Sequence, residues 1–260
     1  MDLGLKGKTA IITGGSKGIG LHTALLLAEE GANVVIVARG ADDLEQAEAL
    51  IKEKTGHEAL AIVADVTSDS DVEYAVVKAV ERFGGIDILV NNAGTSNAAP
   101  FDKVEPAVWR DDLDLKLFGA IRFTQSALPY LKQSGSGAIV NVTAAFAKTP
   151  GASSLPTSVS RAAGLALTKA LSRDLAADGI RVNTVCIGLI RSSQIEAKWR
   201  REAPDATWEE YARDPKHGIP LGRIGDTEEA ARVIVFLVSD SASYVSGTSV
   251  NIDGGAAPAL

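Results

Sequence analysis

The segment Thr13–Gly20 reads TGGSKGIG and decides the fold. A β-branched, apolar run (Thr9–Thr13) leads into it, and a run with apolar residues at helical spacing (Leu21–Glu30) follows it. A glycine-rich turn between a strand and a helix lets backbone N–H groups approach an anion, and the helix N-terminus adds partial positive charge. In this context the segment predicts a pyrophosphate site; a tight turn without a ligand is the alternative.

Short apolar runs and helical patterns alternate along the rest of the chain. The apolar runs predict strands at Thr9–Thr13, Asn33–Ala38, Ala59–Asp65, Ile86–Asn91, Ala138–Thr143, Arg181–Ile187 and Ser249–Ile252. The helical patterns lie at Leu21–Glu30, Asp42–Thr55, Asp69–Arg82, Pro106–Leu131 (one helix, or two that meet near Gly119), Ser158–Ala177 and Thr227–Val238. Strands that are apolar on both faces and separated by helices form right-handed βαβ units in one parallel sheet. We therefore predict an α/β protein with a single Rossmann-type domain over residues 1–260.

The composition narrows the kind of partner. The 260 residues are 46% hydrophobic and 23% charged, which is ample for a folded core. Acidic residues outnumber basic ones by 33 to 26, and the net charge of −7 argues against a nucleic-acid binder. This charge also gives no support for binding an anionic membrane surface. The one cysteine, Cys186, rules out a disulfide framework and indicates a reducing compartment.

Sequence patterns for targeting, membrane insertion and metal binding bear on location and partners as well. Met1–Gly15 does not have the pattern of a signal peptide, and no run of about 18 apolar residues predicts a membrane span. No group of His, Cys, Asp and Glu has metal-ligand spacing. We expect a cytoplasmic protein that takes a small-molecule substrate and binds no metal, nucleic acid or membrane.

One segment, at about residues 190–222, breaks the alternation of strands and helices. It is polar and contains two tryptophans, and it lies between the sixth predicted strand and the last predicted helix. A long connection inside a compact domain often serves as a lid or binding loop, so we interpret it as a substrate-loop insertion. An ordinary surface excursion is the alternative. His217 in this segment is a candidate for facing the cleft.

The end of the second predicted strand bears on the choice of cofactor. A site for NAD commonly has Asp or Glu there, which binds the ribose 2′-hydroxyl. Here Ala38 and Arg39 follow each other, and Lys17 adds a second positive charge from the glycine loop. Two cations without a carboxylate favour a 2′-phosphate, so we predict NADP(H) rather than NAD(H).

Motifs along nearly the whole chain then point to a family. Besides Thr13–Gly20 they are Asp65-Val66, Asn91-Asn92-Ala93-Gly94, Arg223-Ile224-Gly225, Tyr244-Val245-Ser246-Gly247 and Ile252-Asp253-Gly254-Gly255. In these motifs the chain resembles the short-chain dehydrogenase/reductase family. The resemblance implies a doubly wound, seven-stranded parallel sheet with the cofactor across the carboxyl edge of its strands. It also implies a homodimer or homotetramer, for which the two long helices at Pro106–Leu131 and Ser158–Ala177 are the expected interface.

The resemblance also implies a set of cofactor-binding residues. In the family, the Asp-Val pair flanks the adenine, and residues after the sixth strand meet the nicotinamide end. The residues expected to bind NADP(H) are Gly14, Ser16, Lys17, Gly18, Ile19, Gly20, Arg39, Asp65, Val66, Asn92, Ala93, Gly94, Arg161, Gly188 and Ile190.

The family's Asn–Ser–Tyr–Lys tetrad is not reproduced in this chain. Its four positions fall on Lys116, Ala144, Thr157 and Arg161, by local pattern. The tyrosines are Tyr74, Tyr130, Tyr211 and Tyr244, none of which lies four residues before a lysine. A threonine hydroxyl is far less acidic than a phenol, whose pKa is about 10. Lys116, Thr157 and Arg161 are the candidate catalytic residues of a non-standard site.

Three functions fit this pattern. The first is an NADP(H)-dependent oxidoreductase that acts on a small organic C=O, C=N or C=C substrate, with Lys116 and Arg161 anchoring an anionic group or stabilising negative charge. The second is a non-redox dehydratase or isomerase on the same scaffold, because a fold does not fix a reaction. The third is a catalytically silent NADP(H)-binding protein.

Overall fold

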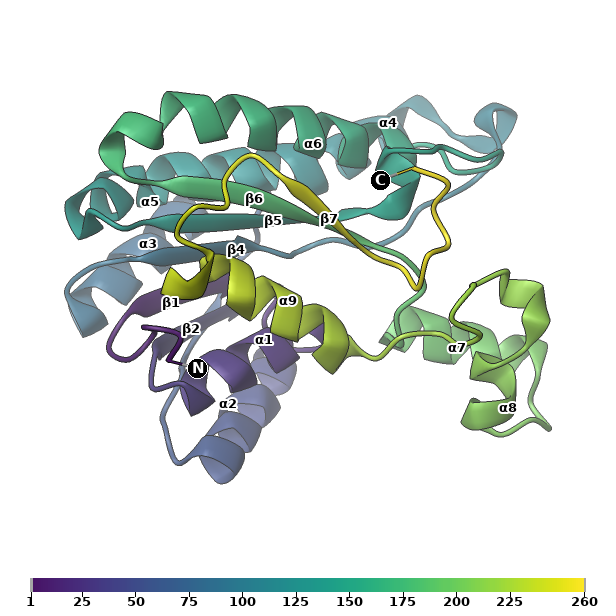
Figure 1. Ribbon diagram of the computed structural model, residues 1–260, viewed down its shortest axis with the longest axis horizontal. Helices are drawn as coiled ribbons and strands as arrows, with labels where there is room; N and C mark the ends of the chain where they lie inside the picture. The colour runs from purple at the N-terminus through teal and green to yellow at the C-terminus, as the bar shows by residue number, and fades with distance from the viewer. Residues whose placement is uncertain (1, 260) are drawn as a thin grey trace.

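A single sheet of seven parallel strands forms the centre of the computed structural model, which describes residues 2–259 (Figure 1). The strands are β1 Thr9–Thr13, β2 Asn33–Ala38, β3 Leu60–Val63, β4 Ile88–Asn91, β5 Ala138–Ala144, β6 Arg181–Ile187 and β7 Ser249–Ile252. Their order in the sheet is β3-β2-β1-β4-β5-β6-β7, and each neighbouring pair is parallel. The predicted doubly wound sheet is confirmed, although β3 and β4 are shorter than the runs Ala59–Asp65 and Ile86–Asn91.

Helices cover both faces of the sheet and enclose two hydrophobic cores. On one face lie α1 Gly18–Glu29, α2 Ala41–Thr55 and α9 Thr227–Val238. On the other lie α3 Asp69–Phe83, α4 Pro106–Leu113, α5 Gly119–Ser134 and α6 Thr157–Asp174. Successive side chains of β1 enter opposite cores, Ile12 the first and Ile11 the second. This double covering explains why the strand sequences are apolar on both faces.

The order of the strands creates a crevice at the carboxyl edge of the sheet. The chain runs outward from β1 through β2 to β3 and then returns to β4, on the other side of β1. Ligands of open α/β sheets bind at such a reversal, outside the carboxyl ends of the strands. The glycine segment after β1 and the residues after β4 therefore meet at one place.

The helix predicted at Pro106–Leu131 contains a change of helical geometry. The α4 helix ends at Leu113, a π-helical turn covers Asp114–Phe118, and α5 continues to Ser134. Two helices thus meet near Gly119, the first residue of α5, although the chain stays helical between them. A Cβ on Gly119 would lie 2.9 Å from Cγ2 of Val66, so the glycine permits close packing against the loop after β3. The π turn contains Lys116 and sets the direction of its side chain.

The insertion folds into a small helical unit that projects from the sheet beyond the end of α9 (Figure 1). It contains α7 Ser193–Glu202 and α8 Trp208–Ala212. The rings of Trp199 and Trp208 lie 5.7 Å apart, and Tyr211 and His217 lie 4.8 Å apart, in edge-on arrangements. His217 also hydrogen-bonds the Tyr211 carbonyl at 2.7 Å, so the histidine belongs to the packing of the insertion. In residues 2–259 none of the helices combines the length and apolar character that a bilayer crossing requires.

Candidate functional site

A cavity of about 500 Å³ occupies the crevice at the carboxyl edge of the sheet. Its wall is formed by the glycine loop, the ends of β2 and β4, the loop after β3, the π turn and the start of the insertion. The lining residues are Gly14, Ser16, Lys17, Gly18, Ile19, Val37, Ala38, Arg39, Gly40, Asp43, Ala64, Asp65, Val66, Asn92, Ala93, Gly94, Thr95, Leu115, Ser192, Ser193 and Gln194. Eleven of the fifteen residues predicted to bind the cofactor are among them.

The glycine loop has the backbone geometry of an anion site. Gly14 and Gly18 have φ of 64° and 57°, a conformation that side-chain-bearing residues rarely adopt. Within the described chain, the Lys17 side chain does not cap α1 and the first turn of the helix carries no acidic residue. The N–H groups and the dipole of α1 are thus available to an anion in the cavity.

Two side chains tie the loops after β1 and β4 together. Asn92 Nδ2 donates to the carbonyls of Thr13 at 3.0 Å and Gly14 at 3.1 Å. Thr13 Oγ1 in turn accepts from the backbone N–H groups of Asn92 at 3.0 Å and Ala93 at 3.1 Å. These contacts fix the floor of the cavity before any ligand binds.

The charges at the mouth of the cavity are paired. Lys17 Nζ lies 2.8 Å from an Asp43 carboxylate oxygen, and Arg39 Nη1 lies 3.8 Å from Asp65. The end of β2 carries no carboxylate, but the first turn of α2 brings the carboxylate of Asp43 beside Lys17, and the sequence pattern did not predict this pair. Both cations are exposed, at 61% and 75%, and exposed pairs contribute only about 0–1 kcal/mol. An anion that enters the cavity can therefore pair with Lys17 and Arg39 in place of their present partners, Asp43 and Asp65.

Four predicted cofactor residues do not line this cavity. Gly20 packs behind the glycine loop, where a Cβ would lie 2.2 Å from the Gly14 carbonyl oxygen. Gly188 packs on Asp253, and Ile190 is 5% exposed and contacts Gly225. Ser192, Ser193 and Gln194 form the cavity wall after β6, in the place expected for Gly188 and Ile190. The fourth residue, Arg161, lies directly behind the wall.

Arg161 connects the cavity to a buried polar centre. Its Nη1 donates to the Val142 carbonyl at 2.7 Å. A Cβ on Gly94 would lie 2.5 Å from Arg161 Nη2, so the guanidinium packs directly against this residue of the cavity wall. Gly94, the fourth residue of the motif Asn91-Asn92-Ala93-Gly94, thus leaves the space that the Arg161 guanidinium occupies.

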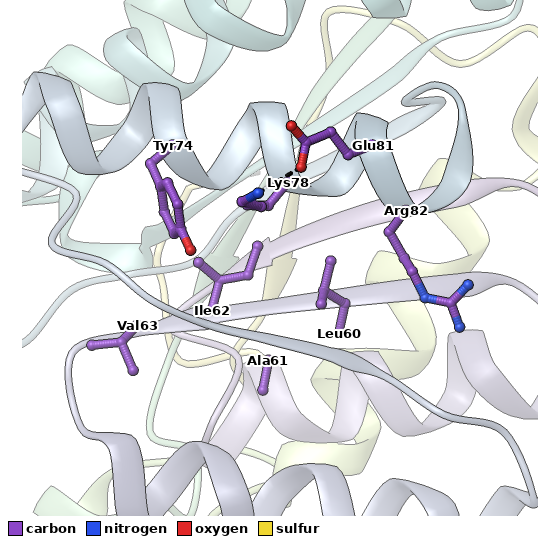
Figure 2. Close-up of a pocket in the computed structure, with 8 residues that line it drawn as sticks. All are labelled: Leu60, Ala61, Ile62, Val63, Tyr74, Lys78, Glu81 and Arg82. Carbon is purple, nitrogen blue, oxygen red and sulfur yellow. Dashed lines mark hydrogen bonds and ion pairs between the residues drawn. The ribbon is translucent and has the colours of Figure 1, made fainter.

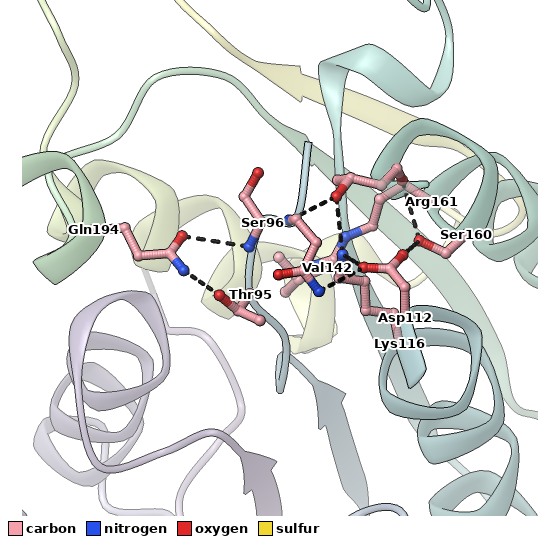
Figure 3. A network of polar contacts seen from close by, with 10 residues as sticks. Thr95, Ser96, Asp112, Lys116, Val142, Ser160, Arg161 and Gln194 are labelled. Carbon is pink, nitrogen blue, oxygen red and sulfur yellow. Dashed lines mark hydrogen bonds and ion pairs between the residues drawn. The ribbon is translucent and has the colours of Figure 1, made fainter. Parts of the chain in front are cut away.

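The structure brings the other two catalytic candidates, Lys116 and Thr157, together beside Arg161. Figure 3 shows Lys116 with Asp112 and Arg161. Lys116 Nζ donates to Thr157 Oγ1 at 3.1 Å and forms an ion pair with Asp112, one helical turn before it. Ser160 Oγ donates to the other oxygen of Asp112 at 2.6 Å. The side chains of Asp112 and Lys116 are both fully buried. Asp112 was not predicted as a site residue, although its position four residues before Lys116 was a usable signal.

The loop after β4 covers this centre, and the insertion contacts the loop. Asn97 donates its backbone N–H to Thr157 Oγ1 at 3.0 Å and its side-chain amide to Asp112 at 3.3 Å. Gln194, at the start of α7, donates to Thr95 Oγ1 and accepts the Ser96 N–H at 3.4 Å. The insertion thus contacts the loop at the mouth of the cavity.

Comparison with known proteins agrees with this architecture. A family model described as enoyl-(acyl carrier protein) reductase matches residues 14–257. A 3-oxoacyl-(acyl-carrier-protein) reductase of Thermotoga maritima is 36% identical over 254 residues, covering 96% of this chain and 98% of the relative. The chain belongs to the short-chain dehydrogenase/reductase family. It is accordingly an oxidoreductase of the short-chain type.

Other members of the short-chain family extend the comparison. A cis-4-hydroxycyclohexanecarboxylate dehydrogenase of Sinomonas cyclohexanicum is 38% identical, with 95% of this chain and 96% of the relative covered. The structure of L-sorbose reductase from Gluconobacter frateurii, complexed with NADPH and L-sorbose, has a TM-score of 0.95 at 34% identity and full coverage of both chains. A short chain oxidoreductase from Pseudomonas aeruginosa PAO1, described as containing an atypical catalytic center, has a TM-score of 0.95 at 33% identity, covering 99% of this chain and 100% of that one.

The centre of this short-chain oxidoreductase has unusual electrostatics. Burial lowers the pKa of Lys116 to about 8; the hydrogen bond and charge of Asp112 raise it, and Arg161 lowers it. Burial lowers the pKa of Arg161 to about 10, with Asp112 opposing. At neutral pH two cations therefore face one carboxylate, and the centre carries one net positive charge.

Ala144, the residue predicted at the family's serine position, has no side-chain donor. Ala144 ends β5 and has only a methyl group. The preceding hydroxyl does not replace a serine, because Thr143 Oγ1 is buried in the sheet and donates to the Val185 carbonyl at 3.1 Å. A developing oxyanion would have to be stabilised by other groups of the centre.

A second cavity, of about 530 Å³, lies along the edge strand β3 and under α3 (Figure 2). Its floor is aliphatic, from Leu60 and Ile62, and its rim carries Tyr74 and the Lys78–Glu81 pair at 2.6 Å. It has no convergent set of polar groups. Within residues 2–259 no three His, Cys, Asp or Glu side chains are close enough together to hold a metal ion. The crevice at the carboxyl edge is therefore the candidate active site.

Proposed function

We propose that the chain is an NADP(H)-dependent oxidoreductase with a non-standard active site, which acts on a small organic substrate with a C=O, C=N or C=C bond. One observation carries the proposal: the cavity at the carboxyl edge of the sheet joins the glycine loop to Gly94, against which Arg161 of the polar centre packs. When bound, NADPH would supply the hydride, and the chain's residues bind the cofactor and orient the substrate.

The residues of the cavity fit this cofactor. The N-terminus of α1 and the glycine loop suit the pyrophosphate, and Asp65 and Val66 lie where the adenine is expected. Lys17 and Arg39 suit the 2′-phosphate, since both are exposed at the mouth of the cavity. Complexes of NADPH with L-sorbose reductase and with the Pseudomonas oxidoreductase support the assignment.

The non-standard site consists of Lys116, Thr157 and Arg161, with Ala144 at the fourth tetrad position. Without a phenol at position 157, the usual proton donor of the family is lacking, so the centre needs another source or a substrate that does not require one. A structural neighbour described as having an atypical catalytic center supports a working site of unusual composition in this family.

The charge of the centre narrows the choice among the three bond types. Hydride addition to a ketone or an enone creates negative charge, which nearby cations stabilise in a buried site. A cationic iminium carbon would be repelled by Lys116 and Arg161, which Asp112 balances only in part. We therefore expect C=O and C=C substrates to react faster than cationic C=N substrates.

A second candidate function is a catalytically silent cofactor-binding protein. The observation in its favour is the burial of the centre, because Thr157 is 5% exposed and Lys116 is 7% exposed beneath Asn97.

For turnover, the loop at Thr95–Asn97 must move away from the centre. The insertion at 190–222 contacts this loop through Gln194, and we propose that it covers the substrate. A non-redox dehydratase or isomerase is the remaining alternative.

The proposed function is tested by NADPH binding and turnover in one set of samples. NADPH fluorescence should show micromolar binding, and NADPH absorbance should fall with neutral ketones or enones and much more slowly with preformed iminium ions. Binding without oxidation of NADPH by any substrate would favour the silent protein. Substrate conversion without NADPH oxidation would favour a dehydratase or isomerase, and no binding would contradict the cofactor assignment.

A further inference from the structure

A buried carboxylate, Asp112, lies beside the proposed catalytic residues. Three donors hold it: Ser160 Oγ at 2.6 Å on one oxygen, and Lys116 Nζ and Asn97 Nδ2 on the other. It is 0% exposed. An ionised side chain is rarely buried so completely. Donors from the π turn, α6 and the loop after β4 fix its orientation.

The hydrogen bonds around Thr157 have a direction. Its Oγ1 accepts from Lys116 Nζ at 3.1 Å and from the Asn97 N–H at 3.0 Å. A hydroxyl has two lone pairs and one proton, so both lone pairs are engaged and the proton remains free to be donated. Lys116 and Thr157 therefore form a chain of donors that starts at the ammonium and ends at a free O–H.

We propose that Asp112 is a positioning residue that holds the Lys116 ammonium against Thr157, and that Lys116 supplies the proton of the reduction through the Thr157 hydroxyl. The proposal rests on the proposed function. NADPH, when bound, would supply a hydride to the substrate carbon, and the electron pair of the C=O bond would move to oxygen. That oxygen bonds the Thr157 proton while Thr157 Oγ1 takes a proton from Lys116 Nζ. The neutral amine regains a proton from water after the product leaves.

This route avoids the weakness of a threonine acid. The hydroxyl receives a proton as it gives one, so no alkoxide forms on Thr157. An ammonium is an efficient acid when its pKa is near the working pH, and burial with the Arg161 charge lowers the pKa of Lys116 to about 8. The charged groups that face Lys116 are Asp112 on α4 and Arg161 on α6, while the covering loop contributes the neutral Asn97.

The first test is Asp112→Asn, with the exposed neighbour Asp111→Asn as a matched control. Removing the negative charge should lower the pKa of Lys116, which can be followed by NMR of ¹⁵N-lysine-labelled protein without cofactor. The high-pH limit of kcat should move down by the same amount, with about a tenfold loss near pH 8 and an unchanged Kd for NADPH. The control should match the wild type in all three measurements.

A second variant tests the proposal even if Asp112→Asn fails to fold. Replacing both partners, Asp112→Leu with Lys116→Met, removes one charge of each sign and leaves Arg161 bound to the Val142 carbonyl, so the net charge of the centre is unchanged and the chain should fold and bind NADPH. Its kcat for ketones or enones should fall about 100-fold. Retained turnover would overturn the proposal and leave the pair a structural one.

The two proposals can fail separately. If the wild type reduces substrate and Asp112→Asn leaves the lysine titration and the pH profile unmoved, the role of Asp112 is refuted and the proposed function stands. If the wild type does not bind NADPH, both are refuted.

Discussion

The side chain at position 157 determines which groups fill the centre. Threonine is short, and the Lys116 ammonium lies 3.1 Å from its hydroxyl oxygen, bound to Asp112 behind it. A phenol ring at this position would extend toward the same space. Replacing residues one at a time therefore cannot convert this centre into the family's usual tetrad.

Restoring the tetrad should require five changes rather than three. Thr157→Tyr, Arg161→Lys and Ala144→Ser alone crowd the ring against Lys116; overpacking of this kind costs about 1–3 kcal/mol, or about 2–10 °C in Tm. Adding Lys116→Asn and Asp112→Val should recover the Tm and raise NADPH-dependent ketone reduction at least about tenfold over the three-change variant. Equal rates and equal Tm for the two variants would contradict the crowding argument.

Arg39 should govern the preference between the two nicotinamide cofactors. Its side chain is 75% exposed at the mouth of the cavity, and its ion pair with Asp65 is loose, with 3.8 Å between the charged atoms. Arg39 is therefore available to a 2′-phosphate. Arg39→Gln should weaken NADPH binding about tenfold and leave NADH binding unchanged, as measured by fluorescence titration. Arg232→Gln, on an exposed ion pair of α9, is the matched control.

Asp43→Asn should have the opposite effect on NADPH affinity, at the same mouth of the cavity. It frees Lys17 from its ion pair, so NADPH should bind more tightly and the gain should shrink at high salt. Weaker NADPH binding by this variant would show that Asp43 is itself a ligand contact.

For single residues, the sequence predicted which side chains belong to the polar centre better than it predicted what they interact with. Lys116, Thr157 and Arg161 were named and do converge, because family motifs place them on α6 and the π turn. Asp43 was missed because the local pattern of its helix gives no sign of a partner in the glycine loop, whereas Asp112 was missed although its spacing of four residues from Lys116 was a usable signal. Whether the three converging residues are catalytic stays a prediction.

Among the elements, the junction between β1 and the first turn of α1 tolerates little change. Gly20 has the Gly14 carbonyl oxygen 2.2 Å and Asn92 Nδ2 2.6 Å from the place of a Cβ. A methyl group there must push apart the loop and the Asn92 contacts that tie β1 to β4.

Gly20→Ala should therefore lower both the Tm and the affinity for NADPH. The cost of overpacking is about 1–3 kcal/mol, which corresponds to a fall of about 2–10 °C. Gly85→Ala is the control, since a Cβ there meets no atom within 4 Å. Differential scanning fluorimetry with and without NADPH measures both effects, and equal behaviour of the two variants would contradict this account of the turn.

The helical stretch at Pro106–Leu131 shows a feature that apolar spacing cannot predict, namely a local change of helix type. Apolar spacing predicted the helical stretch correctly, but a π turn at Asp114–Phe118 adds a residue to one turn without changing composition. The insertion is a similar case: its polar sequence predicted an excursion, while the packing of Trp199, Trp208, Tyr211 and His217 gives it a core of its own.

For the whole molecule, the alternation of buried strands and helices was enough to predict the fold. Every predicted strand is present, because only a sheet covered on both faces buries such runs. The state of assembly is not encoded in this pattern. Exposed apolar side chains around α6, namely Phe118 at 49%, Phe146 at 50% and Val159 at 43%, fit the proposed homo-oligomer interface.

Phe118→Asp should dissociate the proposed homodimer or homotetramer. The change places a charge on an apolar surface that association would bury. Sedimentation velocity at micromolar concentration should show an assembled wild type and a smaller species for the variant. Tyr74→Asp, at a similarly exposed aromatic on α3, should remain assembled. A monomeric wild type would contradict the interface.

The most direct test of the account follows the hydride itself. The chain is incubated with NADPH carrying deuterium at both hydrogen positions of C4 of the nicotinamide and with a ketone or enone, and the product is analysed by mass spectrometry. We predict a product heavier by one deuterium, formed by the wild type and about 100-fold more slowly by Lys116→Met. A bound but unconsumed cofactor, or a product without deuterium, would contradict the claim that this chain is a working oxidoreductase.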